Sequence, residues 1–264
     1  MNDYHIHTNL SLCADPAATV VRYLEAGQAR VSVMGFSDHC WDAEVEGASQ
    51  WYRQQDIAHV LSLRQQILQT DGIHTLVGCE VEMRADLLVA MLPEHMGLFD
   101  YVLIPSSHVH MRGLTVPDRV LTLHELRELL IRRFCAAAET PLADYGVVAL
   151  CHPFTAIGYL PQEHEILREI SNQTFQNCFS IAAQRGIPIE INGEIFLDSH
   201  MPREEHDLPR EYVRMMSVAA ECGCRFYFGS DSHSPDIFLR HHSDERVATL
   251  ARVCGFDYSD LVEK

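Results

Sequence analysis

The segment YHIHT at residues 4–8 places two histidines two positions apart, within a short run of apolar and strand-forming residues. Alternate residues of a β-strand project from the same face, so His5 and His7 are predicted to lie side by side. Such a pair is either two solvent-facing side chains on an edge strand or two ligands of one site. The rest of the chain decides between these interpretations.

Six further strand-like runs follow, and amphipathic helical patterns alternate with them. The strand-like runs are residues 2–7, 31–37, 75–82, 100–106, 146–151, 187–192 and 225–230, and the helical patterns are residues 16–29, 52–70, 122–138, 163–185 and 208–222. The segment ADPAA at 14–18 predicts that the first helix begins with Asp15 as its N-cap and proline at its first position.

This alternation predicts an α/β fold with parallel strands and right-handed crossovers, either as an open sheet or as a barrel. No glycine-rich phosphate loop follows the first strand, which counts against a nucleotide-binding doubly wound fold. No linker-like segment divides the chain, so we expect one domain over residues 1–264.

The composition is acidic, with a formal net charge of −17. Surfaces that bind along a nucleic-acid polymer are normally basic, so such a polymer is disfavoured as a partner, whereas a small anion at a local cationic site is compatible.

No apolar run is long enough to cross a membrane and no leader precedes the first strand, so we expect a cytoplasmic protein. The nine cysteines lack disulfide spacing and are expected to be reduced. Lys264 is the only lysine, which excludes a mechanism that needs an internal one.

Residues that can bind metal ions stand at or near the ends of six of the seven strand-like runs. They are His5, His7, Asp38, His39, Glu80, Glu82, His108, His110, His152, Asp231 and His233. The carboxyl ends of parallel strands face one rim, where the active sites of barrel enzymes lie. A buried group of His, Asp and Glu without cations would be costly. The pattern therefore predicts a polynuclear metal site at the C-terminal ends of the strands.

These motifs, in this order, resemble the polymerase and histidinol phosphatase (PHP) family of metal-dependent phosphoesterases. The segments HIHTNLSLCAD, MGFSDH, DYVLIPSSH and IEIN look most like the histidinol-phosphatase branch, and the resemblance extends from His5 to about Pro235. It implies a distorted (β/α)7 TIM-like barrel with the metal site at the C-terminal ends of the strands. It also implies a hydrolase with two to three divalent ions, which would be zinc, manganese or iron.

The resemblance further implies an assignment of ligands. The first metal would bind His5, His7, Glu80 and Asp231, the second would bind Glu80, His108 and His152, and the third would bind His39, His233 and Cys13. The histidinol-phosphatase pattern has a histidine at the position of Cys13. A thiolate there favours zinc or iron, and without ligation by Cys13 the third site is weak. His110 is an alternative to His108.

The predicted catalytic residues are Glu80, Asp231 and His233. A hydroxide that bridges the metals at Glu80 would attack phosphorus, with Asp231 orienting it and His233 protonating the leaving group.

The expected substrate is a small phosphate monoester, as in the histidinol-phosphatase step of histidine biosynthesis. The alternatives are a phosphodiesterase or exonuclease acting on nucleotides, and a non-catalytic metal-binding module. A binuclear amidohydrolase commonly uses a carbamylated lysine, which this chain does not have. The oligomeric state does not follow from the sequence.

Overall fold

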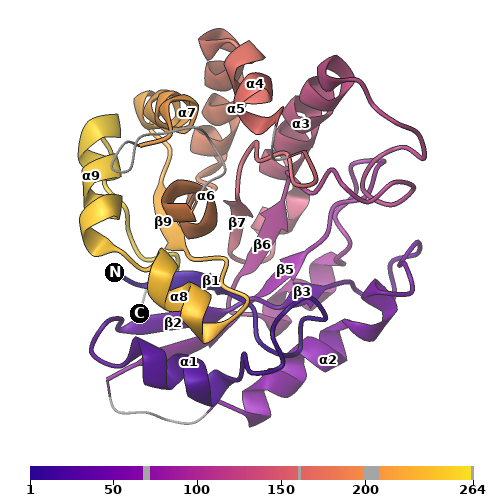
Figure 1. Ribbon diagram of the computed structural model, residues 1–264. Helices are drawn as coiled ribbons and strands as arrows, with labels where there is room; N and C mark the ends of the chain where they lie inside the picture. Colours follow the sequence, from indigo (N-terminus) through magenta and orange to yellow (C-terminus); the bar gives the residue numbers. More distant parts are fainter. Residues whose placement is uncertain (68–71, 160–161, 199–207, 263–264) are drawn as a thin grey trace.

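Parallel strands form the centre of the computed structural model, which describes residues 1–67, 72–159, 162–198 and 208–262 (Figure 1). All seven strand-like runs are confirmed as containing strands. Gly78 divides the third run in two, and a short strand follows the second run directly. The strands are β1 (Asp3–Ile6), β2 (Val33–Phe36), β3 (His39–Cys40), β4 (His74–Val77), β5 (Cys79–Val81), β6 (Val102–Pro105), β7 (Val148–Cys151), β8 (Ile189–Asn192) and β9 (Phe226–Gly229).

The strands pair in two sheets, with orders β1-β2-β4 and β3-β5-β6-β7-β8-β9, and every pair is parallel. The sheets adjoin because β2 leads into β3 and β4 leads into β5. At the opposite edges, an isolated parallel bridge joins Ile6 to Ser232, and the His7 amide donates to the Ser232 carbonyl at 2.9 Å. The parallel sheets confirm the α/β prediction and are consistent with a TIM-like barrel.

Helices surround the strands in Figure 1. They are α1 (Val20–Gly27), α2 (Ile57–Leu61), α3 (Leu123–Ala138), α4 (Glu163–Glu169), α5 (Asn172–Arg185), α6 (Gly193–Asp198), α7 (Arg210–Glu221), α8 (Pro235–His241) and α9 (Asp244–Cys254). Short 3₁₀ helices lie at Tyr52–Gln54, Ser62–Gln65, Pro93–Leu98 and Pro141–Asp144. No helix of the described residues is both long enough and apolar enough to cross a membrane.

Three helix predictions were wrong in detail, and polar side chains that bind backbone amides explain them. The Asp15 carboxylate accepts from Ala17 N at 2.7 Å and forms a turn, so the first helix begins later, with Thr19 as its N-cap. The run 163–185 divides because Ser171 caps a new helix through the amide of Thr174. The run 52–70 is not one helix, because Asp56 accepts from the His59 amide and caps the short helix α2, with a 3₁₀ helix on either side. Residues 68–70 lie outside the described part of the chain.

The buried apolar side chains form two clusters on opposite faces of the strands. Val102 and Ile104 belong to the larger cluster, on which the helices pack, whereas Leu103 between them belongs to the smaller one. This alternation is the period of a β-strand. The smaller cluster contains Tyr4, Val33, Leu76, Tyr101, Leu103, Ala149, Cys151, Tyr227 and Leu261, so both sheets contribute to one shared core. All nine cysteines are free thiols, as predicted.

Tyr101 occupies space left by two glycines in this smaller cluster. Its hydroxyl donates to the Tyr4 carbonyl at 2.8 Å, and a Cβ atom added at either Gly35 or Gly78 would collide with its ring or hydroxyl. We expect Gly78→Ala to lower the free energy of unfolding by roughly 1–3 kcal/mol, because the added methyl group would overlap the buried Tyr101 ring. Chemical denaturation measures this change.

Gly97→Ala is the matched control, because an added Cβ there meets nothing within 4 Å. It should change the free energy of unfolding by less than about 0.5 kcal/mol. Equal effects of the two substitutions would contradict this account of the core.

Candidate metal centre

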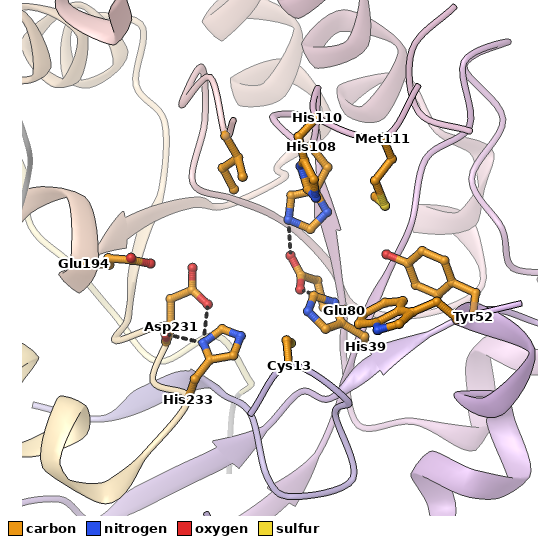
Figure 2. Close-up of a pocket in the computed structure, with 12 residues that line it drawn as sticks. Cys13, His39, Tyr52, Glu80, His108, His110, Met111, Glu194, Asp231 and His233 are labelled. Atoms are coloured by element: carbon orange, nitrogen blue, oxygen red, sulfur yellow. Dashed lines mark hydrogen bonds and ion pairs between the residues drawn. The ribbon is translucent and has the colours of Figure 1, made fainter. Parts of the chain in front are cut away.

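Eight of the nine predicted ligands come together at the C-terminal ends of the strands. They are His5, His7, His39, Glu80, His108, His152, Asp231 and His233, and all except the partly exposed His233 are buried. A cavity of about 460 Å³ opens onto them and is lined by Cys13, His39, Trp51, Tyr52, Glu80, His108, His110, Met111, Ile157, Glu194, Asp231 and His233 (Figure 2). The predicted convergence of the strand ends is therefore present.

The Glu80 carboxylate lies between two groups of histidines. Its Oε1 atom is 2.9 Å from His152 Nε2 and 3.6 Å from His108 Nε2. Its Oε2 atom is 2.8 Å from His39 Nδ1 and 3.5 Å from His7 Nε2. In Figure 2, Glu80 points between His108 and His39. Because each oxygen faces a different group, the carboxylate is placed as a ligand that bridges two ions would be.

Within the described part of the chain, four sets of three side chains bring their donor atoms within 4.8 Å of one another. The sets are His5, His7 and Glu80; Glu80, His108 and His152; His7, His39 and His233; and His5, Cys151 and His152. Imidazole and carboxylate donors at this spacing suit zinc, iron or manganese. The first set contains three of the four residues of the first predicted ligand group, the second set is the second predicted group, and Glu80 belongs to both. The third set shares His39 and His233 with the third predicted group but contains His7 in place of Cys13. Cys151 was not predicted, because its position in a strand gave no sign that its thiol faces this cluster.

Four of the histidines, which we call the core histidines, have their Nδ1 atom in contact with a neighbouring side chain. They are His5, His7, His108 and His152. His5 Nδ1 lies 2.7 Å from a Glu190 carboxylate oxygen, and His108 Nδ1 lies 2.7 Å from a Glu82 oxygen. The Nδ1 atoms of His7 and His152 contact the hydroxyls of Ser11, at 3.1 Å, and Ser107. In metal sites such contacts orient the imidazole and fix its tautomer. The strand-like runs 75–82 and 187–192 contained Glu82 and Glu190, which was a signal for this role, whereas the two serines gave none.

Two residues of the cluster have unusual backbone conformations. The φ angles of His152 and Asp231 are +29° and +52°. Positive φ is uncommon for residues other than glycine, and such strain concentrates at functional sites. At Asp231 it accompanies placement of one carboxylate oxygen 3.5 Å from His5 Nε2 and 3.3 Å from His7 Nε2. The fold thus holds both residues in strained conformations that turn them toward the cluster.

The charges of the cluster are strongly coupled. Burial alone would raise the pKa of Glu80, but the charges of His39 and His108 hold it well below its ordinary value. Burial would lower the pKa of His5, yet Asp231 and Glu190 raise it well above normal. Protons on imidazoles therefore balance the buried carboxylates, and metal cations could take their place.

Cys13 lies on the exposed side of the cavity, next to two of the histidines. Burial would raise the pKa of its thiol, but hydrogen bonds with His233 and His39 lower the pKa to about 6. His110 also lines the cavity but is exposed, and His108 is the histidine beside Glu80. The Asp38 carboxylate accepts hydrogen bonds from Thr8 and Ser11 and so fixes the loop after β1.

No protein-family model matches the chain, and no curated protein matches it in sequence. Its fold is that of solved structures of histidinol phosphatases. The first is the histidinol phosphate phosphatase of Lactococcus lactis in complex with zinc, L-histidinol and phosphate. The alignment covers 97% of this chain and 94% of the other, with a TM-score of 0.58 and 15% identity.

The second is a candidate histidinol phosphatase from Listeria monocytogenes, with a TM-score of 0.63 and 12% identity. The alignment covers 90% of this chain and 97% of the Listeria chain. The resemblance predicted from the motifs is thereby confirmed at the level of the fold.

The pH dependence of metal binding tests the electrostatics of the cluster. Burial would lower the pKa of His233, but Cys13 and Asp231 raise it to about 9. Since a metal ligand must be a neutral imidazole, protons must leave before ions bind. Zinc affinity should therefore rise with pH, about tenfold per unit for each proton released, between about pH 7 and pH 9. Competition with a chromophoric chelator measures it.

His233→Asn is the matching variant, because it removes one imidazole whose raised pKa makes it carry a proton at neutral pH. Its zinc affinity should rise less steeply with pH than that of the wild type. Affinity that does not change with pH in the wild type would contradict the proposed charge balance.

Proposed function

We propose that this chain is a metal-dependent phosphoesterase of the PHP family that hydrolyses a small phosphate monoester, as a histidinol phosphatase does. The observation that carries the proposal is the Glu80 carboxylate, which lies between two groups of buried histidines. The fold shared with the Lactococcus protein, which binds zinc, L-histidinol and phosphate, supports the same chemistry. Within this proposal residues 1–264 form one distorted (β/α)7 barrel, and the Ile6–Ser232 bridge lies at its closure.

Three groups of residues would hold two to three divalent ions. His5, His7, Glu80 and Asp231 form the first group, Glu80, His108 and His152 the second, and His39, His233 and Cys13 the third. The fit is supported by the buried carboxylates, by the donor spacing and by the contacts that hold the second nitrogen of each core histidine. Bound divalent ions neutralise phosphate charge and lower the pKa of water, which are the two requirements of this hydrolysis.

Two residues of these groups, Asp231 and His233, would also act on the attacking water and on the leaving group. The Asp231 carboxylate faces the cavity and can orient the attacking water through a hydrogen bond (Figure 2). His233 has a raised pKa, so it carries a proton at neutral pH that it can donate to the leaving oxygen. With two ions bound His233 is free for this task, whereas with a third ion bound it becomes a ligand.

The cavity favours a small substrate with a single anionic group. Its volume of about 460 Å³ lies within the range of small-molecule sites. None of the described residues that line it is Lys or Arg, and its remaining walls include Trp51, Met111 and Ile157. Among the described residues, a second phosphate would therefore find no guanidinium or ammonium partner there. This observation, together with the net charge of −17, disfavours nucleic acid as the substrate.

Asp231→Asn tests the proposed catalytic centre. It removes a charge from the first ligand group and the group that orients water, so hydrolysis of an aryl phosphate and of histidinol phosphate should fall roughly 100-fold or more. Initial rates of phosphate release measure this effect. Asp118→Asn is the matched control, because this aspartate is exposed and does not line the cavity, and it should leave the rates unchanged.

Bound metal without monoesterase activity in the wild type would contradict the proposed substrate class. Bis-aryl phosphates and nucleotides would then be the next substrates to assay. The ratio of the rates on histidinol phosphate and aryl phosphate shows whether the histidinol-phosphatase branch is the right one.

Cys13→Ser tests whether the thiol is a ligand of the third group. Thiolate ligands give Co²⁺ an intense charge-transfer band in the near ultraviolet, so the cobalt-loaded wild type should show this band and the cobalt-loaded variant should not. Cys254→Ser is the control, because this thiol contacts the Val213 carbonyl between α7 and α9. A band that persists in Cys13→Ser would show that another thiol, such as Cys151, is the sulfur ligand.

A further inference from the structure

Arg133 is a completely buried arginine on α3, behind the metal-facing ends of two strands. Its side chain is 0% exposed, although a guanidinium ion is costly to remove from water. The guanidinium donates to five backbone carbonyls and one carboxylate. The acceptors are the carbonyls of Ser106 at 2.8 Å, Thr115 at 2.9 Å, Met83 at 3.0 Å, Arg84 at 3.2 Å and Pro105 at 3.2 Å, and the Glu82 carboxylate at 3.4 Å.

Glu82 is the carboxylate that connects Arg133 to the cluster. Its Oε1 atom accepts from Arg133 and from the Met83 amide, the latter at 2.8 Å. Its Oε2 atom accepts from the Tyr52 hydroxyl at 2.8 Å and from His108 Nδ1 at 2.7 Å. Both oxygens are therefore fixed, and His108 has its Nδ1–H committed to Glu82. The Nε2 atom of His108 is left facing Glu80, 3.6 Å from its Oε1 atom.

Stability alone is a weak reason for this arrangement. Breaking a buried ion pair is costly, but apolar side chains of similar volume often stabilise a protein as well as the intact pair does. The ion pair instead fixes the orientation of the Glu82 carboxylate relative to its surroundings. The planar guanidinium of Arg133 contacts the segments that end β5 and β6 and also the 111–116 loop. The Thr115 amide donates to the Met111 carbonyl at 2.9 Å, and Met111 lines the cavity.

We propose that Arg133 is a positioning residue that acts through Glu82 to hold His108 in the orientation required of a metal ligand. The inference rests on the proposed metal-dependent function. Arg133 does not line the cavity, so its effect reaches the ions through Glu82 and His108. Substitutions along this relay should weaken the second metal group and leave the others intact.

Metal affinity tests the relay independently of hydrolysis. Metal-free protein would be titrated with Zn²⁺ against a chromophoric chelator to obtain a Kd for each bound equivalent. Glu82→Gln and Arg133→Lys should weaken one equivalent about 10–100-fold, as substitutions behind a metal ligand commonly do. Tyr52→Phe, which removes one donor to Glu82 and keeps the ion pair, should weaken the same equivalent to a smaller extent.

A double-mutant cycle distinguishes positioning from a merely structural role. In a His108→Asn background, Glu82→Gln should have no further effect on zinc affinity, because the imidazole on which it acts is gone. Arg214→Lys is the matched control: Arg214 also donates to two backbone carbonyls, those of Leu167 and Ile170, but lies on α7. It should leave every Kd unchanged.

The inference would be overturned if Arg133→Lys and Tyr52→Phe left every Kd unchanged. It would also be overturned if all equivalents weakened together as the metal-free protein lost thermal stability, or if Glu82→Gln retained its full effect without His108. Tyr52→Phe and Arg133→Lys keep the test valid if Glu82→Gln does not fold. Because zinc binding is measured rather than hydrolysis, failure of this inference is separable from failure of the phosphatase proposal.

Discussion

The burial of one carboxylate among several imidazoles is the constraint on which the arrangement of this protein depends. Glu80 is 1% exposed, and its two oxygens lie within 4 Å of nitrogens from five histidines. Such a group is stable away from water only if positive charge balances it, either as protons on imidazoles or as metal ions. The donors lie in or shortly after β1, β3, β5, β6, β7 and β9, so the parallel arrangement of the strands brings them to one place.

The interior beneath the cluster makes this concentration of donors possible. Tyr101 and its neighbours form the smaller apolar cluster between the strands. Glycine stands at positions where a larger side chain would collide with these residues or with residues of the site. At Gly229, an added Cβ would collide with Glu190 and with His5. The close approach of β9 to this pair therefore requires glycine, and it keeps the Glu190 carboxylate against the imidazole that it orients. The packing of Gly229 and the contact between Glu190 and His5 therefore both hold the His5 imidazole in place.

Much of this could be predicted from the sequence, because strand ends are marked by both hydrophobicity and chemistry. The HxH motif predicted that His5 and His7 lie side by side, and their Nε2 atoms are 3.1 Å apart. The later motifs followed strand-like runs that the structure confirms. The metal donors thus came together as expected, although their identity as ligands stays a prediction.

What could not be predicted depends on contacts distant in sequence or on unusual backbone conformations. Arg133 looks like any charged residue of an amphipathic helix, and nothing in its neighbourhood shows that the strand ends enclose it. The positive φ of His152 cannot be recognised from an ordinary His-Pro pair. The helix starts were misjudged because Asp15 and Ser171 bind nearby amides, and only the three-dimensional structure shows which amides they bind.

The central claim is that the cluster around Glu80 is a metal centre, and the metal content of the protein tests it most directly. The protein would be purified without chelators and its bound metals counted by elemental analysis. The account predicts two to three equivalents of zinc, iron or manganese per chain. A folded protein that contains no bound metal, and takes up none when these ions are added, would contradict it.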